Sequence, residues 1–208
     1  MKKIFKTTAL LIAVAVIAVS CGSPSQEKTI KSLREAITGE TGASAKYQAF
    51  SIKAAEEGYY NIATMFAAAS AAEAIHVSNH NAVLVKLGEE IFVPVINKPV
   101  VKSMAENLQD AIDGELYEAN EMYPAFIAIA KAEKSKDALT SFSWAKDTES
   151  EHARLYAEAL NILLMNGDDV MVASEWYLCT KCGNLFNTVE GVESCPVCAL
   201  KASSFEAF

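Results

Sequence analysis

The sequence predicts a mainly α-helical protein, with a bundle of four long helices followed by a small cysteine-rich module. Apolar residues recur at steps of three and four over four long stretches, which is the period of a helix with one buried face. Four of the five cysteines then form two Cys-x-x-Cys motifs near the C-terminus. A length of 208 residues is enough for one core of about 150 residues and a small further unit.

The charge balance argues against one class of partner. The formal net charge is −8, although three lysines and no acidic residue lie in the first twenty positions. The rest of the chain therefore carries 15 basic and 26 acidic residues. Because such a surface repels phosphate groups, we expect no nucleic-acid partner.

The N-terminus has the pattern of a bacterial export signal. Three lysines precede an unbroken apolar run at residues 9–19, which is too short to cross a bilayer core of roughly 30 Å. This arrangement is typical of a secretory signal peptide, here residues 1–20. Residues 18–21, Ala-Val-Ser-Cys, resemble a bacterial lipobox, although Ala stands where Leu is usual. We therefore expect an exported lipoprotein of the cell envelope, anchored to the membrane through lipidated Cys21, with residues 21–28 as a tether. An ordinary signal peptide with a chance cysteine is the alternative.

Four helices are predicted in the middle of the chain. They are expected at about residues 29–57, 61–87, from 103 onwards, and 136–166. Gly58, Gly88 and Gly167 follow three of them as stop signals. Pro94 and Pro99 lie in a connection that is too long for a tight helical hairpin. Two hairpins joined by one long crossover predict a ferritin-like four-helix bundle over residues 29–167.

Acidic and histidine side chains lie on the apolar faces of these helices, where a surface helix carries few. They are Glu40, Glu73, His76, Glu115, Glu118, Glu149 and His152. Five carboxylates in one core would repel each other and lose their hydration, at a cost of several kcal/mol each. They can escape by protonation, by reaching the surface or by binding cations. A slightly rotated helix explains one such glutamate well, but that explanation would have to succeed several times here.

The spacing of these residues favours cation binding. Glu73 and His76 form one Glu-x-x-His motif, and Glu149 and His152 form another. Residues three apart lie one turn apart on one helix face. A further glutamate precedes each motif by 33 or 34 residues, on the preceding helix. One glutamate from each of two helices, with one Glu-x-x-His from each of two others, is the ligand set of di-iron and di-manganese bundles.

Four stretches carry a resemblance to a known family. They are Gly39-Glu40, Glu73-x-x-His76, Gly114-Glu115-x-x-Glu118-x-x-Glu121-Met122-Tyr123-Pro124 and Glu149-x-x-His152. On these stretches the chain resembles a rubrerythrin, from about residue 27 to the C-terminus. The resemblance implies that Glu73 and Glu149 bridge two irons. It also implies the remaining ligands, which are Glu40 and Glu118 on one iron and Glu115 and His152 on the other.

The resemblance extends to the behaviour of these ligands, which are the predicted catalytic residues. In rubrerythrins the first iron exchanges a glutamate for a histidine on reduction, and the matching residues are Glu118 and His76. Five carboxylates are nearly neutralised by two ferrous or two ferric ions, so electrons can enter and leave at a small charging cost. Tyr47 and Tyr123 match tyrosines that hydrogen-bond to ligating carboxylates, although core packing explains either one equally well.

Two residues near the predicted site need separate interpretations. Pro124 lies inside the third helical pattern, where proline costs about 3 kcal/mol, so we expect a kink beside the site. His80 lies one turn after His76 on the same face. No matching motif reaches its level on the other helices, so we expect a packed or partly exposed histidine.

The C-terminal cysteines predict a second metal site. Cys179 and Cys182 form one motif and Cys195 and Cys198 the other, and four thiolates suit a tetrahedral Zn or Fe ion. Disulfides are the alternative in an exported protein, but closely paired cysteines favour metal. The motifs resemble the knuckles of rubredoxins, which implies a rubredoxin-like domain over residues 174–208 with one iron. The aromatic residues expected around this site are Trp176, Tyr177, Phe186 and Phe205. Spacing does not decide between iron and zinc.

The resemblance implies an activity. A rubrerythrin-type peroxidase would reduce hydrogen peroxide to water in oxidative-stress defence, with electrons from an unidentified donor relayed through the four-cysteine iron to the di-iron site. Rubrerythrins typically pair head to tail, so we expect a homodimer in which each small domain serves the partner's bundle. One alternative keeps the metals and makes the protein a ferroxidase that handles iron. Another is a non-redox envelope lipoprotein with zinc in the four-cysteine site.

Overall fold

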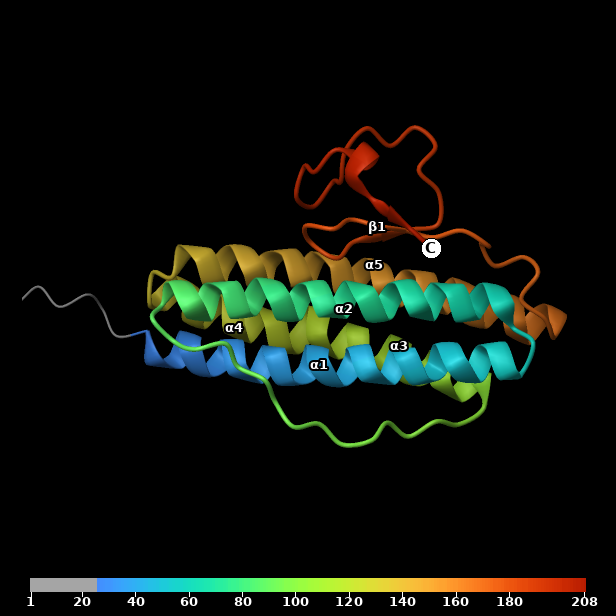
Figure 1. Ribbon diagram of the computed structural model, residues 1–208, viewed down its shortest axis with the longest axis horizontal. Helices are drawn as coiled ribbons and strands as arrows, with labels where there is room; N and C mark the ends of the chain where they lie inside the picture. The colour runs from blue at the N-terminus through green and yellow to red at the C-terminus, as the bar shows by residue number, and fades with distance from the viewer. Residues whose placement is uncertain (1–25) are drawn as a thin grey trace, which may run out of the picture.

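A computed structural model describes residues 26–208, which form a four-helix bundle with a small module lying across it (Figure 1). The predicted fold class is confirmed. The predicted signal peptide, Cys21 and most of the tether fall outside the described residues. From residue 26 onwards, no helix combines the length and the hydropathy that a membrane crossing needs.

The bundle consists of two antiparallel pairs. Its helices are α1 (Glu27–Glu56), α2 (Tyr60–Lys86), α3 (Met104–Tyr117), α4 (Tyr123–Ala132) and α5 (Lys136–Asn166). A π-helical turn, η1 (Glu118–Met122), joins α3 and α4 into one rod. Helix α1 begins two residues earlier than predicted, so residues 27 and 28 belong to the bundle rather than to the tether. The reason is that the Glu133 carboxylate accepts hydrogen bonds from the first-turn amides of Lys28 and Thr29.

The kink predicted at Pro124 takes the form of this π-helical turn. Pro124 has no amide hydrogen and stands in the first turn of α4, where a helix tolerates that loss. The turn before it is widened, because the Tyr123 amide donates to the Glu118 carbonyl five residues back. Such turns are often found at functional sites.

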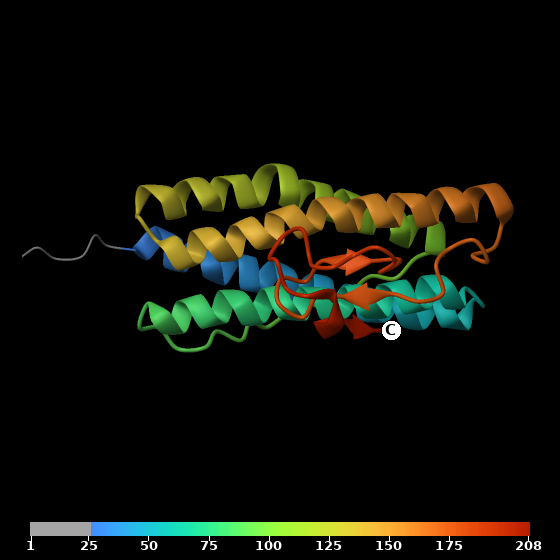
Figure 2. The same cartoon turned by 90° about the horizontal axis from the view of Figure 1, so that it is seen from above.

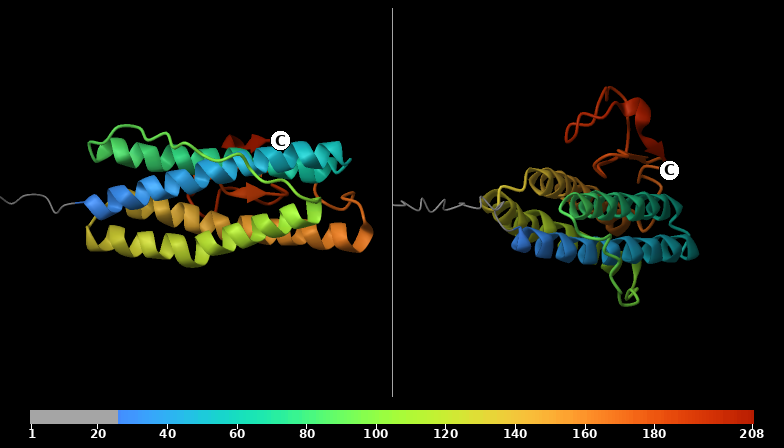
Figure 3. Two further views of the ribbon diagram at one scale, coloured as in Figure 1. Left: turned by 90° about the horizontal axis from the view of Figure 1, so that it is seen from below. Right: turned by 60° about the vertical axis from the view of Figure 1, so that its left-hand side comes forward.

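The long crossover between α2 and α3 runs along the outside of the bundle (Figures 1 and 3). Asn81 of α2 binds the crossover through two hydrogen bonds. The Phe92 amide donates to Asn81 Oδ1 at 2.7 Å, and Asn81 Nδ2 donates to the Phe92 carbonyl at 3.2 Å. Helix α3 then starts at a capping box between Ser103 and Glu106. The two hairpins are therefore joined in the predicted way.

The interior of the bundle has two apolar clusters with a buried polar layer between them. One cluster includes Phe50, Phe66 and Leu108, and the other includes Leu33 and Phe142. The buried glutamates and histidines occupy the helix positions between these clusters. The apolar clusters hold the helices together on both sides of the layer, so its polar groups are kept away from water.

The C-terminal module is a small three-stranded antiparallel sheet with long loops. Its strands are β1 (Tyr177–Leu178), β2 (Leu185–Phe186) and β3 (Glu206–Ala207), in the order β2-β1-β3, with a short 3₁₀ turn, η2 (Ala202–Ser204), before β3. The module lies over α2 and α5 of the same chain (Figure 2). In the linker, the Asp169 carboxylate accepts from the amides of Asn61 and Ile62 at 2.7 and 3.0 Å and so caps the start of α2. A homodimer remains a prediction.

Candidate metal centres

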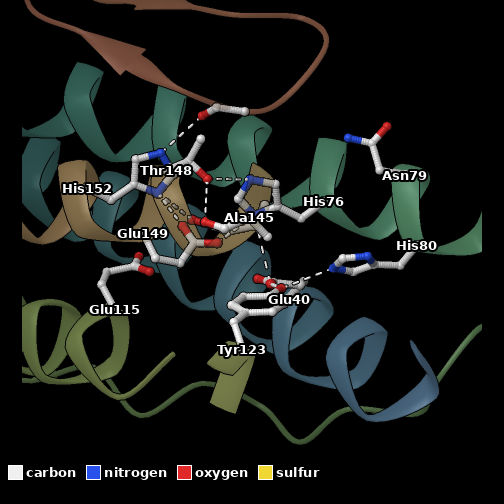
Figure 4. Close-up of polar contacts among 12 residues, drawn as sticks. Glu40, His76, Asn79, His80, Glu115, Tyr123, Ala145, Thr148, Glu149 and His152 are labelled. Atoms are coloured by element: carbon white, nitrogen blue, oxygen red, sulfur yellow. Dashed lines mark hydrogen bonds and ion pairs between the residues drawn. The ribbon is translucent and has the colours of Figure 1, made fainter. Parts of the chain in front are cut away.

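Two groups of four buried side chains meet in the polar layer, and the ligand atoms within each group lie within 4.8 Å of one another. The first group is Glu40, Glu73, His76 and Glu149, and the second is Glu73, Glu115, Glu149 and His152. Glu73 and Glu149 belong to both groups. Figure 4 shows Glu40, His76, Glu115, Glu149 and His152 pointing toward one another from different helices of the bundle.

Glu73 and Glu149 each have one carboxylate oxygen near His76 and the other near His152. His76 Nδ1 lies 2.9 Å from Glu73 Oε2 and 2.9 Å from Glu149 Oε1. His152 Nδ1 lies 2.9 Å from Glu149 Oε2 and 3.4 Å from Glu73 Oε1. With these positions, Glu73 and Glu149 could each share two cations, and the Nδ1 atoms of His76 and His152 could each serve one of them.

Two tyrosines hold the outer glutamates. The Tyr47 hydroxyl donates to Glu115 Oε1 at 2.5 Å, and the Tyr123 hydroxyl donates to Glu40. All four residues belong to the set expected from the sequence. A hydroxyl that donates to one carboxylate oxygen fixes the plane of the carboxylate and leaves the other oxygen for a cation.

Glu118 is the one expected ligand that belongs to neither group. It lies in the π-helical turn, and its Oε1 would be 3.6 Å from a Cβ placed on Gly39 of α1. His76 takes the place beside Glu40 instead, with 3.8 Å between His76 Nδ1 and Glu40 Oε1. Of the two residues expected to exchange, the histidine is therefore the one that completes the first group.

The polar atoms that face the centre lack hydrogen-bond partners among the described residues. They are Glu40 Oε2, both carboxylate oxygens of Glu73 and of Glu149, Glu118 Oε2, and the Nδ1 atoms of His76 and His152. Leaving a buried polar atom unsatisfied costs about 1–3 kcal/mol, and more for a charged group. Carboxylate oxygens and imidazole nitrogens are ligands that iron and manganese accept. The residues therefore fit a pair of divalent cations.

Without cations, protons are expected to compensate for the crowding. Burial raises the pKa of Glu40 to about 8, and burial with nearby carboxylates raises the pKa of Glu115 and Glu118 well above their ordinary value. Burial also opposes ionisation of Glu73, but contacts with His152 and His76 outweigh it and lower the pKa to about 2. Burial lowers the pKa of both histidines, but the surrounding carboxylates outweigh it and raise them.

Removing the metal is therefore expected to make the fold less stable as the pH rises. Between the ordinary value of 4.5 and about 8, the folded state holds a proton on Glu40 that the unfolded state has lost. The raised pKa values of the histidines act in the same direction above 6.5, whereas Glu73 opposes it only below 4.5. The free energy of unfolding of the metal-free protein should thus fall from about pH 5 to pH 8.

Urea unfolding at several pH values measures this dependence, with the iron-loaded protein as the control. Bound cations take the place of the protons, so the loaded protein should not lose stability in the same window. A free energy of unfolding that rises with pH in the metal-free protein would contradict the prediction.

The four cysteines of the module meet at one point. All are buried and free of disulfides, with 3.4 Å between the sulfurs of Cys179 and Cys198 and 3.5 Å between those of Cys182 and Cys195. The Sγ atoms lie within 4.8 Å of one another, as ligands of a single cation do. These four cysteines therefore form no disulfide bonds in the structure.

The aromatic residues around the cysteines differ in part from those expected. Phe186 and Phe205 pack there and stack at 4.9 Å. Trp176 packs into the bundle core instead, because it lies where the linker joins strand β1. Trp144 of α5 packs against the cysteines instead and holds the Lys181 ammonium 5.0 Å above its ring. The bundle thus supplies part of the wall of the four-cysteine site.

The first knuckle lies directly on the di-metal site. The carbonyls of Cys182 and Gly183 accept hydrogen bonds from the Nε2 atoms of His76 and His152, each at 3.0 Å. Because each Nε2 donates outward, each Nδ1 is the nitrogen that faces the carboxylates, where it carries a proton in the metal-free protein and could bind a cation once that proton is lost. The same two histidines therefore contact both sites.

Glycine at position 183 makes this contact possible. Its φ of +88° lies in the left-handed region, and an added Cβ would collide with the His76 ring, 2.9 Å from its Cδ2, and lie 3.2 Å from the Ala72 carbonyl. Asn79 adds a third contact, because its Nδ2 donates to the Lys181 carbonyl at 2.9 Å.

Comparison with known proteins agrees with this geometry. The model of the family described as rubrerythrin matches residues 31–160. The chain belongs to the rubrerythrin family. Nigerythrin of Nitratidesulfovibrio vulgaris is 38% identical over 180 residues, 86% of each chain. Rubrerythrin-2 of Clostridium acetobutylicum is 34% identical over 180 residues, 85% of this chain and 94% of the relative.

Solved structures extend the likeness of this rubrerythrin-family chain to the whole fold. The fully reduced, all-ferrous state of nigerythrin is 36% identical and superimposes with a TM-score of 0.78, covering 98% of this chain and 100% of that one. The bacterioferritin of Desulfovibrio desulfuricans, at 20% identity and a TM-score of 0.66, covers 72% and 88% and shares the fold alone.

Some contacts around the two sites could not be predicted from the sequence. Thr148 Oγ1 lies 3.0 Å from His76 Nε2 and donates to the Ala145 carbonyl. Thr148 has no motif that would single it out. Asn79 follows His76 by three residues, so helical spacing could have placed it on the face that meets the module.

Proposed function

We propose that this protein is a peroxide reductase that reduces hydrogen peroxide to water, with electrons delivered through the four-cysteine site. The observation that carries the proposal is the direct contact between the two sites. The carbonyls of Cys182 and Gly183 accept hydrogen bonds from the two histidines whose other nitrogens face the bridging carboxylates. A storage or binding protein would have no need of such a contact.

Reduction of one hydrogen peroxide to two waters takes two electrons and two protons. Two ferrous ions held in the bundle would supply both electrons together, and one iron in the four-cysteine site would restore them singly. The chain's own residues prepare the site for this use. Five carboxylates offset most of the charge of two cations in either oxidation state, and the apolar clusters on both sides keep bulk water out. Tyr47 and Tyr123 hold the outer carboxylates in place.

We also propose that the mature protein is exported and anchored through a lipid on Cys21, and that it works as a homodimer. The signal-like pattern of the first twenty residues supports the anchor. The electron donor would then be another protein of the envelope. Mass spectrometry of the mature N-terminus tests the anchor, and an unmodified Cys21 would rule it out.

Anaerobic stopped-flow spectroscopy tests the activity. The reduced, iron-loaded full chain is mixed with hydrogen peroxide, and both metal sites are expected to oxidise rapidly. If neither site oxidises, the protein is not a peroxide reductase. A ferroxidase would instead turn over with Fe(II) and oxygen and would have no need of Cys179. Iron and zinc analysis separates the non-redox alternative, because a zinc site in the module is colourless.

A further inference from the structure

His80 is the one histidine of the bundle that the di-metal site does not use. It lies on α2, one turn beyond His76, and is completely buried. Its Nδ1 lies 2.8 Å from Ser141 Oγ of α5, and its Nε2 lies 3.0 Å from the Tyr123 hydroxyl of α4. Figure 4 shows the ring pointing to the place where Tyr123 meets Glu40.

The donors in this chain of contacts can be assigned one by one. When Glu40 binds a cation it is ionised and can only accept, so the single hydroxyl hydrogen of Tyr123 is donated to it. The Tyr123 oxygen can therefore only accept from His80, so the hydrogen of the imidazole is on Nε2. The other nitrogen then carries a lone pair and accepts from the Ser141 hydroxyl. Burial and the neighbouring His76 lower the pKa of His80 to about 3, which agrees with a neutral ring.

The order of these bonds depends on Ser141. If the hydrogen of His80 were on Nδ1, Nε2 would become an acceptor and would compete with Glu40 for the Tyr123 hydroxyl. The Ser141 hydroxyl donates to Nδ1 when the imidazole hydrogen is on Nε2, and this hydrogen bond stabilises the tautomer in which Nε2 donates to Tyr123. All three hydrogen bonds therefore point the same way, from Ser141 through His80 and Tyr123 to Glu40.

The two halves of the di-metal site differ in how the hydroxyl of the supporting tyrosine is directed. Tyr47 holds Glu115 as Tyr123 holds Glu40, but the Tyr47 ring is backed by Phe66 and Tyr156, at 5.7 and 5.5 Å between ring centroids. The Tyr123 ring is packed as well, 6.2 and 6.0 Å from Phe126 and Phe142, but its hydroxyl oxygen also accepts from His80, and no hydrogen bond among the described residues directs the Tyr47 hydroxyl in that way. A change at His80 should therefore affect one half of the site and leave the other as an internal reference.

We propose that His80 is a positioning residue of the metal centre, which together with Ser141 directs the Tyr123 hydroxyl to Glu40 and so holds that carboxylate in its ligand orientation. The side-chain hydrogen bonds of His80 go to Ser141 and Tyr123 and to no expected metal ligand, so His80 acts on Glu40 through Tyr123. The inference concerns how tightly the site holds metal, and it does not depend on hydrogen peroxide being the substrate.

The test measures the affinity of each iron in the iron-loaded, reduced full chain by anaerobic equilibrium competition with an Fe(II) chelator. In His80→Leu one of the two bundle irons is expected to bind about 10–100-fold more weakly, and the other as in the unmodified chain, because loss of a supporting contact typically has that effect. Ser141→Ala should weaken the same iron to a smaller extent. In His80→Gln the side-chain amide can still donate to Tyr123, so most of the affinity should return.

Leu84→Ala is the matched control. Leu84 lies one turn further along α2, is completely buried and belongs to the apolar cluster that also contains Tyr123. The variant should lower the melting temperature and leave both iron affinities unchanged.

Equal weakening of both irons in His80→Leu, or no weakening of either, would overturn the proposal. If His80→Leu does not fold, the comparison of Ser141→Ala with Leu84→Ala decides, because only Ser141→Ala should separate the two irons. A wild-type protein that fails to reduce peroxide would refute the proposed function and leave this result unaffected.

Discussion

Glu149→Ala is expected to abolish iron binding in the bundle and to leave the four-cysteine site loaded. Glu149 is buried and belongs to both ligand groups, with one oxygen 2.9 Å from the Nδ1 of each histidine. Its loss removes one ligand from each cation position and one of five negative charges that hold two cations. A supporting residue around a metal typically accounts for about 10–100-fold in affinity, so the loss of a bridging ligand should exceed that.

Metal analysis and the visible spectrum of the purified variant measure this effect. Glu151→Ala is a suitable control, since Glu151 lies two residues further along α5 but pairs with Arg154 at the surface and should not influence the layer. If Glu149→Ala lost the colour of the four-cysteine site and kept both bundle irons, the division of the chain into two metal sites would be wrong.

Gly183→Ala is expected to leave both metal sites loaded but to slow electron exchange between them on the order of 100-fold. The added Cβ would collide with the His76 ring and lie 3.2 Å from the Ala72 carbonyl, so the knuckle has to move away from the bundle. A displacement of about 1 Å between reacting groups can cost a factor of that size. The hydrogen bonds to both histidines should weaken together, because their acceptors are consecutive carbonyls.

Stopped-flow spectroscopy after a single addition of peroxide follows the delayed oxidation of the four-cysteine chromophore. Gly191→Ala is the matched control: Gly191 lies in the same module with φ of +73°, but a Cβ there meets nothing within 4 Å. It carries the same backbone strain without the collision. Similar exchange rates in the two variants would show that the contact at Gly183 does not matter.

The sequence was most informative where a pattern is fixed by one helix or one short loop. The Glu-x-x-His motifs of Glu73 and Glu149 predicted which side chains share a face, because helical spacing sets that locally. The cysteine knuckles were found in the same way. Contacts between elements could not be found from spacing, since they depend on how the elements rotate and dock. His80 of α2 meets Tyr123 of α4 only because both side chains reach into the interior of the assembled bundle, and Trp144 replaces Trp176 beside the cysteines only because the module rests on α5.

The hydrogen bonds between Asp169 and the start of α2 hold the linker where it leaves α5, so even a module that moved away from the histidines would stay beside its docking site. A tether of this kind keeps two reactants at an effective concentration of the order of millimolar, however dilute the protein is. Transfer between the two sites should then be a first-order process that neither dilution nor crowding changes.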